Sequence, residues 1–406
     1  MKREKITKSV SLLLMLVMML GAFAGCYNNY RLKKFDIDVG DEITFGKYKD
    51  EEIEWEVITR HFLPEEGKVR VELLSKYALD CQPFNEDGES SWEDCSLRKW
   101  LNDDFYNEAF SKSEQKQIVD NTYFDYMGDA RYLTDKVYLM SLLWYRMRTD
   151  EAVCEPTDYA EDQDIDMKDG NCRYWGRDIL QVATNGQGGE IKWYPLVFSY
   201  DGSISAAIDQ LHKEKAYTAD NIGVRPVINV EYKAPFTQKD LDEGDYVTFG
   251  TYDEAPIEWI VVDKERDGVT LFSRYGLEDR RMDKDVQDKF EDTELYDWLN
   301  GDFKSDSFNG KEQKKLVAFG KDEYVTVPDF EEFKGYRHGD VSYELFASYT
   351  PAYFEKHEAN DDNVLDRYWL RDIDTDKYTA YDFTMLRISA LPGEEHSVRP
   401  VIKISF

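Results

Sequence analysis

The sequence predicts an α+β protein made of two tandem homologous domains, each with a mainly antiparallel sheet and a central pair of helices. Three observations predict this class. The chain repeats its own sequence at domain-sized spacing, strand patterns open and close each repeat, and helical patterns lie between them. With 406 residues, the chain is long enough for two or three domains.

The repeat is visible as blocks that return in the same order. The run 100–105, Trp-Leu-Asn-Asp-Asp-Phe, returns 198 positions later as Trp-Leu-Asn-Gly-Asp-Phe at 298–303. The opening block around Trp55 returns around Trp259, and Val-Arg-Pro-Val returns near each copy's end. We predict repeat domain 1 at 37–232 and repeat domain 2 at 240–406, with a short linker that contains Pro235.

Strand patterns open each copy. Ile53, Trp55 and Val57 alternate with polar residues, which is the period of a half-buried strand. Gly46 interrupts the preceding strand pattern and predicts a bulge or turn there. Alternating apolar residues over 69–74 predict the next strand.

A helix pair is predicted in the middle of each copy. Leu97, Trp100, Leu101 and Phe105 keep the spacing of one helical face, so we interpret Trp100 and its counterpart Trp298 as core residues. Asp94 and Asp292 are the expected N-caps of this helix in the two copies.

A second helix is predicted by the capping boxes Ser111-x-x-Glu114 and Asn309-x-x-Glu312. Asn102, with its counterpart Asn300, lies inside the first helical pattern, where asparagine has poor propensity. We expect its amide to bind a loop backbone, with ligand contact as the alternative.

The closing part of each copy also predicts strands, at 137–140, in a Tyr-Trp-x-Arg block and in the Val-Arg-Pro-Val block. Pro226 and Pro400 cannot donate to a ladder, so each closing strand should have an edge or a bulge at its proline.

The N-terminus has the pattern of an export signal. A basic start, an apolar run over 10–20 and small residues predict a lipoprotein signal peptide at 1–25. Phe23-Ala24-Gly25-Cys26 resembles a bacterial lipobox, in which the cysteine is lipidated, and 26–36 would form a lipidated tether. The alternative is an ordinary signal peptide with an incidental cysteine. The apolar run is too short for a comfortable membrane-spanning helix.

Charge and cysteine count limit the possible partners. A net charge of −32 disfavours a nucleic-acid partner, because binding a phosphate backbone needs a basic face. Four cysteines follow Cys26, and an even number in an exported chain permits the local disulfides Cys81–Cys95 and Cys154–Cys172, with free buried thiols as the alternative. Their spacing argues against zinc, and we predict no cofactor or metal.

The candidate ligand-binding residues are the tryptophans and arginines that recur in the closing blocks. They are Trp175, Arg177, Arg225, Trp369, Arg371 and Arg399. On a strand, Trp175 and Arg177 would share a face, which suits stacking or cation–π contact. The functional interpretation is a cleft of arginine and tryptophan for a carboxylate or a sugar. The alternative is a structural arginine network that ties the closing strands together. No catalytic motif is recognisable, and 83 acidic residues make any chosen carboxylate pair uninformative.

Several runs of the first copy resemble a known family. These are Leu-Ser-Lys-Tyr-Ala-Leu-Asp at 74–80, the run from Trp92 to Tyr106, Tyr-Trp-x-Arg at 174–177 and Gly-Val-Arg-Pro at 223–226. They resemble the domain of unknown function 6273 family of bacterial surface and secreted proteins. The closing strands are similar to C-type-lectin-like and formylglycine-generating-enzyme-like folds, and this likeness implies a fold and no activity.

Together these patterns predict a surface-anchored bacterial lipoprotein that acts outside the cytoplasm as a recognition module for a glycan, peptide or protein. Its other expected partner is the cell membrane, through the N-terminal lipid. The alternatives are an exported enzyme, carbohydrate-active or otherwise hydrolytic, that uses acidic residues, and a scaffold whose copies contact each other.

Overall fold

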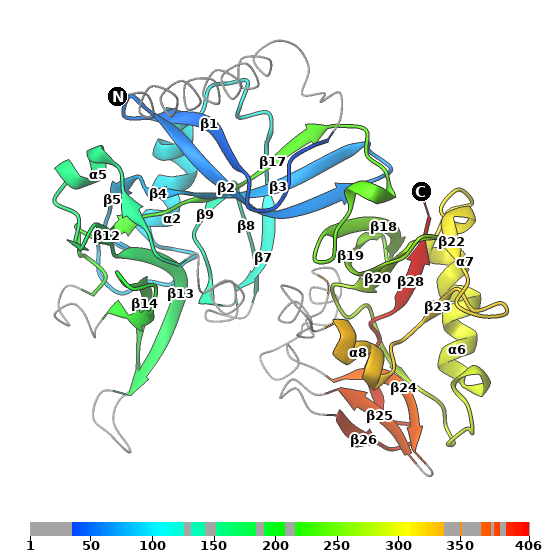
Figure 1. The fold of residues 1–406 in the computed structure, drawn as a ribbon. Helices are drawn as coiled ribbons and strands as arrows, with labels where there is room; N and C mark the ends of the chain where they lie inside the picture. Colours follow the sequence, from blue (N-terminus) through cyan, green and yellow to red (C-terminus); the bar gives the residue numbers. More distant parts are fainter. Residues whose placement is uncertain are drawn as a thin grey trace, which may run out of the picture.

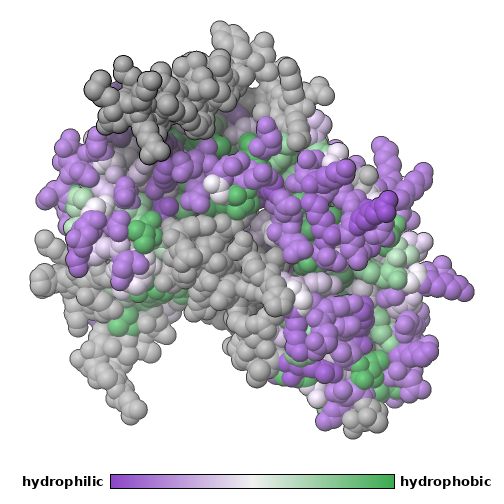
Figure 2. Space-filling view, viewed as in Figure 1, coloured by the Kyte–Doolittle hydropathy of each residue, from purple (hydrophilic) through white to green (hydrophobic). Residues whose placement is uncertain are grey.

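The computed structural model describes residues 35–125, 131–142, 152–183, 191–207, 216–336, 350, 367–374, 377–381 and 387–405. It is a mixed α+β structure that is mostly sheet, with few helices (Figure 1). The predicted signal peptide, Cys26 and most of the tether lie outside the described residues. On the face shown in Figure 2, the coloured residues are mainly hydrophilic, as expected for a strongly acidic chain.

One sheet runs through both halves of the chain, and within the described residues it has twelve strands. Its N-terminal strands are β1 (Glu42–Tyr48), β2 (Glu51–Leu63), β3 (Lys68–Ser75), β6 (Ile118–Val119), β9 (Val137–Tyr138) and β17 (Val227–Lys233). Its C-terminal strands are β18 (Tyr246–Tyr252), β19 (Ala255–Lys264), β20 (Val269–Ser273), β22 (Leu316–Val317), β23 (Val325–Thr326) and β28 (Val401–Ile404). The strand order is β22-β28-β20-β19-β18-β2-β3-β17-β6, and β1 pairs with β2 in addition. Strands of the N-terminal half and their counterparts in the C-terminal half thus follow the same order within each half.

The halves meet where β18 pairs with β2 in parallel, Tyr246 opposite His61 and Val247 opposite Phe62 (Figure 1). Arg60 reinforces this joint. Its Nε and Nη2 donate to the two carboxylate oxygens of Asp245 at 2.9 and 2.7 Å, with both side chains only 3% exposed. The predicted domain ranges 37–232 and 240–406 therefore share one sheet.

Each half adds a smaller sheet of five described strands. The N-terminal one has the order β15 (Ile204–Ala206), β14 (Ile191–Phe198), β13 (Tyr174–Ala183), β16 (Gly223–Val224) and β5 (Asp80–Cys81). The C-terminal one has the order β26 (Arg387–Ala390), β25 (Lys377–Tyr381), β24 (Tyr368–Asp374), β27 (Glu395–Ser397) and β21 (Asp279–Arg281). The predicted interruption at Pro226 and Pro400 is the place where the chain passes from the small sheet to the large one.

The opening strands form as predicted around a buried tryptophan. Trp55 Nε1 donates to Phe45 O at 2.6 Å, and Trp259 Nε1 donates to Phe249 O at 2.7 Å. Gly46 has φ of 78°, and the pairing of β1 with β2 shifts register there, so the predicted bulge is confirmed.

The predicted first helix is present in both halves, with a π-helical turn in its middle. It comprises α2 (Ser96–Trp100), η1 (Leu101–Phe105) and α3 (Tyr106–Ala109), and then α6 (Glu294–Trp298), η7 (Leu299–Phe303) and α7 (Lys304–Ser307). The N-cap prediction is wrong by one residue, because Cys95 Sγ and Thr293 Oγ1 accept the capping bonds instead of the preceding aspartates.

The predicted second helix is also wrong, although its capping boxes form. Ser111 N donates to Glu114 Oε2, and Asn309 N donates to Glu312 Oε2, each at 2.8 Å. Turns follow the first box, and only the 3-10 turn η8 (Gln313–Lys315) follows the second. Each glutamate also accepts a bond from the bulge glycine of β1 or β18, so the box fastens the helix end to the sheet.

The remaining described elements connect these layers. They are β4 (Tyr77–Ala78) with β10 (Glu155–Pro156), β7 (Asn121–Asp125) with β8 (Arg131–Asp135), β11 (Met167–Lys168) with β12 (Asn171–Cys172), α5 (Asp158–Asp162), η5 (Gln238–Asp240), η6 (Phe290–Asp292) and α8 (Phe330–Tyr336). No described helix combines the length and the apolar composition needed to cross a membrane.

Candidate functional site

The predicted tryptophans of the closing blocks lie in the core. Trp175 and Trp369 are fully buried, and their indole N–H groups donate to Gln82 O at 2.8 Å and Arg280 O at 2.6 Å. Trp175 therefore holds the chain just after β5, and Trp369 holds β21 itself. In this position they offer no face to a ligand.

Arg225 and Arg399 are also buried, at the crossing between the two sheets of each half. Arg225 Nε donates to Ser75 O at 2.7 Å. Arg399 donates to Ser273 O through Nε at 3.0 Å and to Arg274 O through Nη2 at 2.7 Å. The structure thus places these guanidiniums where they satisfy backbone carbonyls, as in the alternative of a structural arginine network.

Arg177 and Arg371 are half-buried and have different partners. The Arg177 guanidinium stacks on the Tyr123 ring with its Cζ 3.8 Å from the centroid. Arg371 forms ion pairs with Asp329 and Glu332. A register shift in β13 between Trp175 and Ile179 interrupts the strand alternation on which the shared-face prediction depended. The six predicted residues do not form one cleft.

The four cysteines of the described region are buried and unbridged. Cys154 and Cys172 are adjacent: Cys172 N donates to Cys154 O at 2.8 Å, and the two thiols share a hydrogen bond. Cys81 and Cys95 contact the carbonyls of Ala160 and Trp92, respectively. Disulfide formation stays a prediction, and the geometry favours the Cys154–Cys172 pair.

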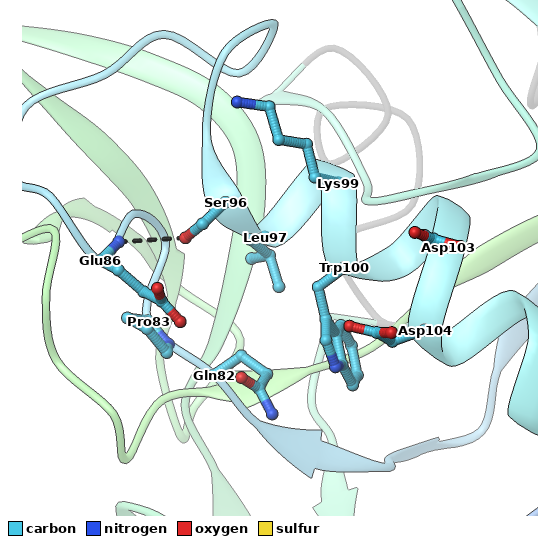
Figure 3. Close-up of a pocket in the computed structure, with 9 residues that line it drawn as sticks. All are labelled: Gln82, Pro83, Glu86, Ser96, Leu97, Lys99, Trp100, Asp103 and Asp104. Carbon is cyan, nitrogen blue, oxygen red and sulfur yellow. Dashed lines mark hydrogen bonds between the residues drawn. The ribbon is translucent and has the colours of Figure 1, made fainter.

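A surface pocket of about 220 Å³ lies between the loop after β5 and the helix α2-η1 (Figure 3). It is lined by Gln82, Pro83, Glu86, Ser96, Leu97, Lys99, Trp100, Asp103 and Asp104. The helix begins against the loop because Ser96 N donates to Asn85 Oδ1 and Leu97 N donates to Phe84 O. The Glu86 N–H donates to Ser96 Oγ at 3.0 Å, which fixes the loop end of the pocket (Figure 3).

Trp100 is the aromatic wall of this pocket, and it is half-buried rather than core. Its ring packs edge-on against Tyr48, with 6.4 Å between the centroids, and lies tilted against Phe105, with 5.5 Å between the centroids. Tyr48 in turn donates its hydroxyl to Asp80, and burial raises the pKa of the Asp80 carboxyl. The ring is thereby held from behind, while its pocket side remains accessible.

The rim of the pocket is acidic. Glu86, Asp103 and Asp104 are exposed carboxylates among the lining residues, against a single cation. That cation, Lys99, donates from Nζ to Asp94 O at 2.9 Å. The arrangement can attract and stack a cation, because a tryptophan face and nearby carboxylates both favour positive charge.

Trp298 is the corresponding tryptophan of the C-terminal half. The same residue types pack behind its ring, but a different residue lies over its outer face. Trp298 packs against Tyr252 at 6.2 Å and Phe303 at 5.0 Å, and Tyr252 donates to Glu278. The Arg280 guanidinium, at the position of Gln82, lies over the ring with its Cζ 4.0 Å from the centroid. The positions of Pro83 and Ser96 are Arg281 and Glu294, which form an ion pair at 2.7 Å.

The sequence did not predict this site, because an apolar helix face does not show which of its side chains other parts of the protein leave exposed. The signal that could have found it is the contrast between the two halves of the sequence. The tryptophan is the same in both, whereas Gln82 and Glu86 are replaced by Arg280 and Lys284. Of the buried acids whose pKa is raised, Asp80, Asp178 and Asp245, none lines the pocket.

The described residues include no group of three or more His, Cys, Asp or Glu side chains placed to hold a metal ion. Searches of curated proteins and of solved structures gave no match. Residues 70–232 match the family model described as Domain of unknown function (DUF6273), which assigns that domain family to the stretch containing the pocket and Trp175.

Proposed function

We propose that this protein is a surface-anchored, extracytoplasmic binding protein whose ligand site is the pocket over Trp100. One observation carries the proposal: a half-buried tryptophan faces an open pocket with three exposed carboxylates, while its counterpart Trp298 is covered by Arg280. Tryptophan is strongly enriched among residues that dominate binding energy. The expected ligand is an extracellular peptide, protein or glycan.

The anchor proposed here is a lipid on Cys26. The basic start, the apolar run and the small residues before this cysteine support export and lipidation at the cell surface. Cys26→Ala should release the protein into the medium or leave its signal peptide uncut. Membrane fractionation identical to wild type after signal cleavage would contradict this anchor.

We propose further that the halves arose as two copies of one domain. The matching strand orders of their sheets and the bonds of Trp55 and Trp259 support this origin. The N-terminal copy would carry the ligand site, and the C-terminal copy would support it through the shared sheet. The likeness of the closing strands to C-type lectins stays a prediction.

The experiment for the binding proposal is a screen of the full chain against cell-wall glycans, cell-wall fragments and peptides, with each hit retested on two matched variants. Trp100→Ala should weaken binding of a true ligand by about tenfold or more. Trp298→Ala removes the same side chain from the covered site and should leave binding unchanged. If the hits bind to Trp100→Ala as tightly as to wild type, a ligand site at this pocket is refuted.

A further inference from the structure

We infer that the pocket over Trp100 recognises a guanidinium group, the arginine side chain of an exposed peptide or protein segment. This inference rests on the proposed function, because it names the ligand chemistry of the same pocket. Three features carry it: an internal guanidinium at the corresponding place, the charge of the lining residues and the size of the pocket.

The first feature is Arg280, which shows what fits against this tryptophan. Its guanidinium lies over Trp298 at 4.0 Å and forms an ion pair with Glu278 at 3.2 Å. Gln82 stands at the same position of the first half, and its neutral side chain hydrogen-bonds Asp80 instead. Among the described residues, no Lys or Arg lies over the Trp100 ring. A ligand guanidinium would occupy there the place that Arg280 fills in the second half.

The second feature is the unbalanced charge of the lining residues. In the second half, Glu294 is neutralised by Arg281 at 2.7 Å and by Lys284 at 3.4 Å. In the first half, Ser96 stands at the position of Glu294, and Pro83 and Glu86 stand at the positions of the two cations. The lining there has three carboxylates, Glu86, Asp103 and Asp104, against the one cation Lys99. The open pocket therefore lacks the positive charge that closes its counterpart, and a cationic ligand would supply it.

The third feature is size. A pocket of about 220 Å³ is smaller than the roughly 300–1,000 Å³ of typical small-molecule sites, so one side chain fits better than a large ligand. A planar guanidinium can stack on the indole while its N–H groups reach the rim carboxylates Asp103 and Asp104. An ammonium lacks this flat face, so lysine should bind more weakly than arginine.

Saturation-transfer NMR on the full chain tests the inference with three small probes. N-acetyl-argininamide should bind with a dissociation constant on the order of 1 mM. N-acetyl-citrullinamide has nearly the same shape without the charge and should give no saturable signal. N-acetyl-lysinamide should be weaker than arginine, and added salt should weaken both cations because the carboxylates are exposed.

Two variants place the signal at the pocket. Trp100→Ala should weaken arginine binding by about 2- to 30-fold, the range expected for one lost cation–π contact. Gln82→Arg copies the closed second half, so the new side chain should cover the ring and abolish binding while the fold is kept. This variant changes a half-buried loop residue, which keeps the test valid if Trp100→Ala unfolds.

The outcomes separate the inference from the proposed function. Equal binding of arginine and citrulline probes, or arginine binding that survives Gln82→Arg, overturns the guanidinium inference. A glycan or neutral peptide whose binding depends on Trp100, together with no arginine binding, overturns the inference and keeps the proposed function. Loss of Trp100 dependence for every ligand of the screen overturns both.

Discussion

Trp100 and Trp298 have the same neighbours and different surroundings on their outer face. Each packs against a tyrosine and a phenylalanine of its own half, and the tyrosine donates to a carboxylate in both cases. Among the described residues, a guanidinium covers Trp298 and none covers Trp100. The residues that support the ring, here called the frame, are therefore alike in the two halves, whereas the residue over its outer face, here called the cover, differs. The frame follows from the shared fold, and the cover determines whether a ligand can reach the ring.

The bonds of the frame agree closely between the halves. Asn102 Nδ2 donates to Val137 O at 2.8 Å, and Asn300 Nδ2 donates to Val325 O at 2.9 Å. In each half the amide oxygen also accepts the N–H of that same valine. These asparagines hold the starts of β9 and β23, which confirms their predicted backbone role and makes the differences at the pocket more informative.

The largest effect is expected from the buried arginines of the two sheet crossings. Arg225→Ala and Arg399→Ala should each lower the free energy of unfolding by about 3–5 kcal/mol, because buried carbonyl acceptors lose their charged donors. Urea denaturation measures both. If the halves share one frame, the two losses should agree within about 1 kcal/mol. A loss confined to one variant would break the comparison.

An acid-dependent effect is expected at the joint between the halves. His61 is buried on β2, and its Nε2 lies 2.7 Å from Thr248 Oγ1. Burial lowers the pKa of His61 to about 4, although nearby Glu258 and Glu231 oppose this, with Arg70 and Arg274 adding to it. The unfolded chain therefore takes up this proton first as the pH falls. Stability from this group is complete above about pH 6.5 and is lost toward pH 4, by on the order of 3 kcal/mol.

The measurement is the unfolding free energy at several pH values for wild type and His61→Gln, which removes the titrating group. Wild type should lose more stability than the variant between pH 6.5 and 4. Parallel curves for wild type and His61→Gln would contradict a buried, uncharged histidine at the joint.

A smaller, matched effect is expected at the bulge glycines. Gly46 and Gly250 have φ of 78° and 76°, and a Cβ atom at either would lie 2.7 or 2.6 Å from the ring of Phe110 or Phe308. Gly46→Ala and Gly250→Ala should each cost about 1–3 kcal/mol through backbone strain and overpacking. Calorimetric melts compare them, and an alanine tolerated in one half only would show that the opening strands differ.

Local chemistry carried most of the successful predictions. The alternation around Trp55, the glycine bulge and the capping-box bonds all depend on residues close in sequence or on one strand. The second helix failed because a capping box satisfies its own N–H groups whether or not a helix continues. Here Glu114 also binds Gly46 N, a contact 68 residues away that the motif alone does not reveal.

The pairing of the two halves and the pocket over Trp100 could not be predicted from the sequence, for a different reason. Pairing of β2 with β18 joins residues far apart in the chain, and either strand pattern would look the same at a free edge. The exposure of Trp100 depends on the loop from Gln82 to Glu86, which has no periodic pattern. The shared face of Trp175 and Arg177 was predicted from strand alternation, which fails at the bulge in β13.

We propose that, although both equivalent tryptophans are half-buried, only Trp100 presents an uncovered ring face to a ligand. Fluorine NMR of the full chain labelled with 5-fluorotryptophan tests it directly, with the signals of Trp100 and Trp298 among the nine tryptophans assigned by Trp→Phe variants. On titration with N-acetyl-argininamide, the Trp100 signal should shift in a saturable way and the Trp298 signal should stay in place. A shift of Trp298, or no shift of Trp100 at saturating concentration, would contradict the account.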